Sequence, residues 1–192
     1  MRRYGIVLAV WLCGTGVCLA QQGPQGELQG FYQRIQTFKM RSGGGEGSYF
    51  ADYNKATNGG GFGFVYNITD RFGMYQQTGF LGGAKDQDLT MRLITEFQGM
   101  RVTKNAKGID FFAKGGVGFA RYVLQQSGSQ LGVYYNVAFQ YGGGAEIDIG
   151  RGMFLLLEVT GLSMGVPELY FTDDRSKWCN TLMITPGIAI RF

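Results

Sequence analysis

Strict alternation between apolar and small or polar residues is the feature that most limits how this chain folds. In the last segment, the even positions from Leu182 to Phe192 are apolar, whereas most odd positions between them are small or polar. Residues two apart lie on the same face of a β-strand. The pattern therefore predicts a strand with one apolar face that ends on an aromatic residue.

Eight such segments follow residue 45, separated by clusters of turn-forming residues. None of them contains the run of about 20 apolar residues that a membrane-spanning helix needs. Glycine accounts for 33 of the 192 residues, well above its ordinary share of about 7%, and this density opposes long helices. The sequence predicts an all-β fold whose neighbouring strands are joined up and down. The predicted strands are 47–54, 61–68, 72–82, 89–99, 110–122, 135–149, 153–162 and 182–192.

The N-terminal residues have the pattern of a cleaved signal peptide. Two arginines precede an apolar run from Tyr4 to Val17, and Ala20 supplies a small residue before the expected cleavage point. The run is shorter than the about 20 residues that span a bilayer. We therefore expect a signal peptide over 1–20, a flexible polar leader over 21–45 with a short element near residues 31–40, and a barrel domain over 46–192.

The ionisable residues exclude several classes of function. Cleavage after Ala20 leaves 16 basic and 14 acidic side chains, which is no electrostatic signature of nucleic-acid binding. The sequence contains no histidine, which excludes a Ser-His-Asp hydrolase and histidine-based metal sites. Cys179 is the one cysteine beyond the signal peptide, and we expect it to be inert. We expect a non-enzymatic protein without catalytic residues, bound metal or cofactor.

Two architectures accommodate eight alternating strands: a soluble lipocalin-like barrel with an apolar interior, and a membrane barrel with an apolar exterior. The apolar faces are large and aromatic, whereas the opposite faces carry glycine, alanine and a few charges. Such faces fit the narrow, side-chain-filled lumen of an eight-stranded membrane barrel. Because unpaired charges there are costly, we expect a salt-bridge network. The predicted lumen residues are Arg92, Glu96, Lys114, Glu146, Glu158 and Arg191.

The connections differ between the two predicted ends of the barrel. Short turns at 69–71, 104–108 and 150–152 lie on the side of both termini. Longer connections at 55–60, 83–88, 124–133 and 165–178 lie opposite. This asymmetry is typical of periplasmic turns and extracellular loops. The loop residues that we expect to face outside the cell are Tyr170, Asp173, Asp174, Arg175 and Trp178.

Residues 46–192 resemble a small eight-stranded bacterial outer-membrane barrel of the OmpA/OmpX-like superfamily. The resemblance rests on the final "GIAIRF" and on the strand-like "GSYFADY" and "GGGAEIDIGRGMFLLLEV". It implies a transmembrane barrel in the outer membrane of a Gram-negative bacterium, surrounded by membrane lipid and lipopolysaccharide. It also implies that the assembly machinery recognises Ile188, Ile190 and Phe192. Pro186 departs from the pattern, because proline removes a ladder donor, and we expect a bulge or a water-satisfied gap there.

Three functions are consistent with these features. The first is a non-enzymatic outer-membrane barrel with a filled polar lumen and loops that serve a structural, adhesive or surface-interaction role. The second is a narrow pore or small-solute transporter, in which the lumen charges form the path. The third is a soluble exported barrel that binds an apolar ligand. The sequence names no ligand, and a fold does not define a function.

Overall fold

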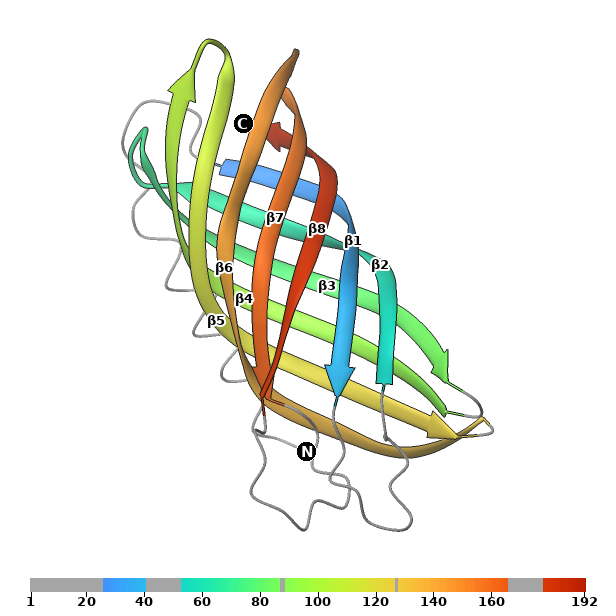
Figure 1. The fold of residues 1–192 in the computed structure, drawn as a ribbon. Helices are drawn as coiled ribbons and strands as arrows, with labels where there is room; N and C mark the ends of the chain where they lie inside the picture. Colours follow the sequence, from blue (N-terminus) through green and yellow to red (C-terminus); the bar gives the residue numbers. More distant parts are fainter. Residues whose placement is uncertain (1–25, 41–52, 87–88, 127, 166–177) are drawn as a thin grey trace, which may run out of the picture.

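The structure is a computed structural model that describes residues 26–40, 53–86, 89–126, 128–165 and 178–192. Eight antiparallel strands follow one another around a closed barrel (Figure 1). The predicted signal peptide lies outside the described residues. Within them, no helix is long and apolar enough to cross a membrane. The strands are β1 (Gly26–Met40), β2 (Tyr53–Asn67), β3 (Phe72–Asp86), β4 (Leu89–Ala106), β5 (Ile109–Gln126), β6 (Ser129–Gly150), β7 (Met153–Gly165) and β8 (Trp178–Arg191).

The barrel closes where β8 pairs with β1. Each strand pairs with its neighbour in sequence, and β1 and β8 complete the circle. The ends of the described chain meet there, because the Gly26 N–H donates to the Phe192 carbonyl at 3.2 Å and the Phe192 N–H donates to the Gly26 carbonyl at 3.0 Å. A closed sheet satisfies its backbone groups without water. The predicted all-β, up-and-down topology is confirmed.

The first strand lies in the segment that the sequence predicts to be a flexible leader. That prediction is wrong for residues 26–40, which form β1 and pair with both β2 and β8. Gln29 and Gln33 occupy two of the inward positions of this segment, and Gly30 and Arg34 occupy two of the outward positions, so its alternation is weak. Of the predicted strand 47–54, residues 47–52 lie outside the described residues, while Tyr53 and Asn54 begin β2.

The predicted short turns 69–71 and 150–152 at the end that carries the termini are confirmed, whereas 104–106 of the predicted turn 104–108 belong to β4. Lys107 and Gly108 form that turn, with φ angles of 53° and 82°, and Arg151 and Gly152 form another, with φ angles of 57° and 74°. Positive φ at both central residues is the requirement of a two-residue hairpin turn whose twist matches the strands. We call this end the short-turn end and the opposite one the long-loop end.

Several predicted loops at the long-loop end are strand instead. Residues 55–60 lie within β2, and β3 runs to Asp86. Most of the predicted loop 124–133 is strand, because β5 ends at Gln126 and β6 begins at Ser129. Of the predicted loop 165–178, residues 166–177 lie outside the described residues. The strands are longer than the apolar alternation alone indicates, because they continue beyond their apolar faces.

The two faces of the strands are assigned correctly for β5 to β8 and incorrectly for β4. Phe119 and Tyr135 are exposed on the outward face, as their alternation predicts. On β4, however, the apolar residues Met91, Leu93 and Phe97 are buried in the lumen. The prediction assumes that the more apolar face of every strand faces lipid, which is wrong where the lumen itself is apolar.

Pro186 interrupts the pairing of β8 with β1, as the sequence predicts. The register is the same on both sides of the interruption, but Tyr32 and Gln33 have no ladder partners opposite Pro186 and Thr185. The hydroxyl of Thr185 and the side-chain oxygen of Gln33 are buried there without a hydrogen-bond partner. The irregularity is therefore a gap and not a bulge.

Replacing Pro186 by valine is expected to raise the free energy of unfolding by about 1 kcal/mol, the net contribution of one hydrogen bond. Valine supplies the missing backbone N–H and suits a strand. Urea unfolding in lipid vesicles measures the change. Ile188→Val, on the same face of β8 where the ladder is intact, is the control with little expected effect. An unchanged midpoint for the Pro186 variant would contradict this account of the gap.

Candidate functional site

Five charged residues from five strands meet in the lumen near the short-turn end. They are Glu27 of β1, Arg101 of β4, Asp110 of β5, Glu146 of β6 and Arg191 of β8. We call them the basal ion cluster. Successive side chains of a strand point to opposite faces, and these five occupy the inward positions of their strands. The cluster joins sheet positions far apart in sequence across the barrel.

Glu146 is the centre of the basal ion cluster. Its Oε1 accepts from Arg101 Nη1 at 2.7 Å and its Oε2 accepts from Arg101 Nη2 at 2.5 Å, a bidentate pair. Arg191 Nη2 also donates to Glu146 Oε2. The Glu146 side chain is fully buried. Bidentate arginine–carboxylate pairs are both strong and geometrically specific, so this pair fixes the positions of β4 and β6 across the lumen.

Glu27 and Asp110 complete the coordination of the two guanidinium groups. Glu27 accepts from Arg101 at 3.1 Å and from Arg191 at 2.8 Å, while Asp110 accepts from Arg191 at 2.6 Å. The Arg101 guanidinium carbon lies 4.2 Å from the ring centroid of Phe112, which is buried beside it. Each cation therefore contacts carboxylates, and the charges that have lost water are paired as burial requires.

A second polar layer lies further along the lumen. Lys114 of β5 and Glu158 of β7 form an ion pair at 2.7 Å, and both side chains are buried. The Lys114 ammonium also donates to Gln77 Oε1 at 2.7 Å, and the Gln140 amide donates to the same oxygen at 3.0 Å. The Tyr75 hydroxyl donates to Gln140 at 3.1 Å. This layer crosses the lumen from β3 to β7.

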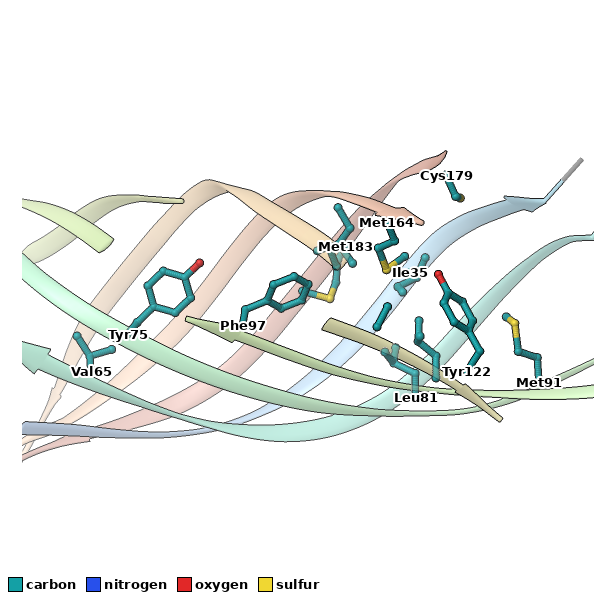
Figure 2. Close-up of a cluster of buried hydrophobic side chains, with 14 residues drawn as sticks. Ile35, Val65, Tyr75, Leu81, Met91, Phe97, Tyr122, Met164, Cys179 and Met183 are labelled. Carbon is teal, nitrogen blue, oxygen red and sulfur yellow. The ribbon is translucent and has the colours of Figure 1, made fainter. Parts of the chain in front are cut away.

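Apolar side chains fill the lumen toward the long-loop end. Figure 2 shows this cluster extending from Val65 and Tyr75 at one end to Met91 and Cys179 at the other. The Tyr122 hydroxyl donates to the Gly165 carbonyl at 2.8 Å, which satisfies its polar group. We call the following residues the apolar plug: Ile35, Leu81, Met91, Leu93, Phe97, Tyr122, Leu162, Met164, Cys179 and Met183.

Four of the six predicted lumen residues lie in the lumen. Glu146 and Arg191 belong to the basal ion cluster, and Lys114 pairs with Glu158 in the second layer. The prediction is wrong for the other two, because Arg92 and Glu96 are exposed on the outward face of β4.

The sequence reasoning missed Glu27, Arg101 and Asp110. Glu27 lies in the segment interpreted as a leader, and Arg101 lies beyond the end assigned to its strand, 89–99. Asp110 is the first residue of the predicted strand 110–122, but it was not assigned to the lumen. The alternation of Arg101 with the outward residues Met100 and Val102 is the signal that would have extended β4.

The exterior carries a girdle of exposed apolar side chains over all eight strands. Phe62, Phe139 and Leu157 are examples from three sides of the barrel, with 56%, 44% and 55% of their surface exposed. Buried charges and an apolar exterior are the reverse of a soluble surface. This architecture is that of an outer-membrane barrel, whose outward band contacts lipid. The exterior contradicts the alternative of a soluble exported barrel.

The predicted assembly residues lie together at the short-turn end of β8. Ile188, Ile190 and Phe192 all point outward and are exposed; their role as an assembly signal stays a prediction. Trp178 begins β8 at the long-loop end, where its ring stacks on Phe139 with the centroids 5.7 Å apart. The other predicted loop residues, Tyr170, Asp173, Asp174 and Arg175, lie outside the described residues.

No protein-family model and no curated protein matches this sequence, but several solved structures have the same fold. Neisserial surface protein A matches with a TM-score of 0.66 and 8% identity over 87% of this chain and 97% of that one. The N-terminal β-barrel domain of Pseudomonas aeruginosa OprF has a TM-score of 0.56 and 17% identity, with coverages of 90% and 100%. Ail, the attachment invasion locus protein of Yersinia pestis, has a TM-score of 0.52 and 12% identity, with coverages of 88% and 99%.

These matches confirm the predicted fold class, that of the small eight-stranded outer-membrane β-barrels. The sequence identities are low, so the likeness concerns the fold. Together with the apolar exterior of the barrel, this fold confirms the predicted location in the outer membrane of a Gram-negative bacterium.

Proposed function

We propose that this protein is a closed, non-enzymatic outer-membrane barrel that presents its long-loop connections at the cell surface. The barrel is a rigid scaffold, and the connections serve a structural, adhesive or other surface-interaction role. The observation that carries this proposal is the filled lumen, which contains the basal ion cluster, the Lys114–Glu158 layer and the apolar plug in succession. Among the described residues, side chains contact one another across the lumen in each of these layers, and this supports a closed lumen.

The arrangement of the connections supports the role at the surface. The two longest segments between strands, 41–52 and 166–177, both join strands at the long-loop end. Among the described residues, the short-turn end holds tight turns and the two chain ends, Gly26 and Phe192. Ail, which has the same fold, is named for attachment and invasion, and this supports an adhesive role for the corresponding surface of this chain.

Conductance across planar lipid bilayers tests the closed lumen. The purified wild-type protein is expected to give no stepwise current at neutral pH, because the lumen charges are paired and the long-loop half is apolar. The matched control is a larger outer-membrane porin inserted into the same bilayers, which must give open-channel steps. Reproducible steps from the wild-type protein would contradict the closed scaffold and favour the narrow pore.

Shortening the connections tests the surface role. Residues 42–51 and 167–176 are each replaced by an Asn-Gly turn, which suits a hairpin. We expect the variant to retain the faster migration of the unboiled protein on SDS gels, since all eight described strands are left intact. Cells that express it are expected to adhere less to an epithelial monolayer than cells with the wild-type protein. Equal adhesion would contradict the adhesive role.

A further inference from the structure

Four polar side chains lie side by side on the outward face of the barrel. They are Gln76 and Thr78 of β3 and Glu96 and Gln98 of β4, and we call them the outward quartet. Gln76 is directly opposite Gln98, and Thr78 is directly opposite Glu96. The residues that alternate with them along both strands face the lumen. The quartet is therefore a continuous polar patch on a surface that contacts lipid.

The depth of the outward quartet follows from β4. Lys104 and Arg92 are exposed on the same outward face, and Gln98 lies midway between them. A strand rises about 3.4 Å per residue, and a tilt of about 40° places residues 92 and 104 roughly 30 Å apart along the membrane normal. This separation matches the hydrocarbon thickness of about 30 Å. The two charged residues thus mark the membrane surfaces, and Gln98 lies near the centre.

The polarity at this depth is confined to one side of the barrel. On β6, β7 and β8 the corresponding outward residues are apolar, as at Tyr141, Leu157 and Ile188, which are all exposed. The outward polar residues described on β7 and β8, Ser163 and Asn180, lie toward the long-loop end. A general tolerance for polar groups on the exterior therefore does not account for the quartet.

The outward quartet is incompletely satisfied within one copy of the chain. The Gln76 amide donates to Glu96 Oε1 at 3.4 Å, at the long limit of a hydrogen bond. Among the described residues, Glu96 forms no ion pair. Lipid tails donate no hydrogen bonds, so polar groups at this depth need protein partners. Polar side chains inside a membrane accordingly tend to face other protein segments.

We propose that the outward quartet is a dimerisation surface, covered by the same surface of a second copy of this chain. Two copies inserted in one direction are related by a two-fold axis along the membrane normal, which brings identical depths together. The quartet is self-complementary in this arrangement. Glutamine amides both donate and accept, and the Gln98 amide of each copy supplies the donor that the Glu96 carboxylate of the other lacks.

Apolar residues around the outward quartet supply the packing of the proposed interface. Phe80 and Met74 flank it on β3, Met100 flanks it on β4, and Phe62 and Phe119 lie on the adjoining strands; all five are exposed. The ring centroids of Phe62 and Phe80 lie 6.2 Å apart. Aromatic residues and methionine are enriched in interfaces, and hydrogen-bonding side chains hold membrane segments together.

Cross-linking in isolated outer membranes tests the proposal. The full chain carries Cys179→Ser together with Gln98→Cys, Gln76→Cys or, as the matched control, Leu157→Cys on the far side at the exterior of β7. A short bis-maleimide is expected to give a dimer band from the quartet positions and none from the control. Equal cross-linking at Leu157, no dimer from either quartet position, or a product with a different protein would each overturn the proposal.

The molar mass of the refolded protein provides the second test. Light scattering in detergent is expected to give the mass of a dimer for the wild type and of a monomer for Gln76→Leu/Glu96→Leu/Gln98→Leu. Asn180→Leu, which also removes an outward amide, is expected to stay dimeric. The gel shift of unboiled samples verifies that each barrel has folded. A monomeric wild type, or a dimeric triple variant, would overturn the proposal.

Discussion

Replacing Glu146 by leucine is expected to lower the free energy of unfolding by about 3–5 kcal/mol, the cost of leaving buried charges without their partner. The substitution removes the two carboxylate oxygens that accept from Arg101, one of which also accepts from Arg191. The two guanidinium groups then face each other with Glu27 between them and less negative charge to balance them. Urea unfolding in lipid vesicles, followed by the fluorescence of Trp178, measures the loss.

The control for Glu146→Leu is Asp148→Asn on the same strand. Asp148 is exposed beside the turn and accepts a hydrogen bond from the Gly150 N–H, which asparagine can also accept. Its expected effect is within about 0.5 kcal/mol, as for ordinary surface substitutions. If Glu146→Leu and Asp148→Asn unfold at the same urea concentration, the basal ion cluster does not hold the barrel together.

Gly118→Ala is expected to cost about 3 kcal/mol or more and to reduce the amount of folded barrel in outer membranes. A methyl group at Gly118 would lie 1.7 Å from the Glu96 carbonyl oxygen and 2.7 Å from its carbon. Because the obstacle is the backbone of β4, no side-chain rotation relieves the clash, and β4 and β5 must separate. Overpacking against fixed atoms is costly for this reason. The fraction of protein that migrates faster without boiling measures the loss.

Gly115→Ala on the same strand is the matched control. A methyl group there would lie 3.9 Å from its nearest neighbour, the Gln140 carbonyl oxygen, which is an ordinary contact. Gly115 faces outward, so the methyl group would meet lipid. We expect the folded fraction to equal that of the wild type. A normal folded fraction for Gly118→Ala would show that the strands at this point adjust more than the geometry indicates.

The outer faces of β5 to β8 could be predicted from the sequence because their two faces differ strongly. On β6 and β7, aromatic and branched residues alternate with glycine, alanine and acids, so that Glu146 and Glu158 are placed inward by periodicity alone. The C-terminal strand is equally clear. In these strands a shift of one residue would expose charges to lipid, and this cost fixes the assignment.

The remaining assignments of strand faces failed where the lumen is lined by apolar instead of polar side chains. On β4 both faces carry apolar residues, since Met91 and Phe97 fill the apolar plug while Met100 and Val102 face outward. Periodicity gives two sets of residues but not the side on which each lies, and only contacts with other strands decide it. Glu27 was missed for a related reason, because the inward glutamines of β1 make a strand resemble a polar leader.

The pairing of β1 with β8 has a consequence for the order of events in folding. Every other pairing joins strands adjacent in sequence, and each can form once a short connection has closed. The pairing of Gly26 with Phe192 closes a loop that contains the whole barrel, and the entropic cost of closure rises with loop length. Local hairpins therefore form at lower entropic cost than this junction. Pro186 leaves the hydrogen-bond ladder of this same junction incomplete. The pairing with the highest entropic cost of closure is therefore one with fewer backbone hydrogen bonds to hold it.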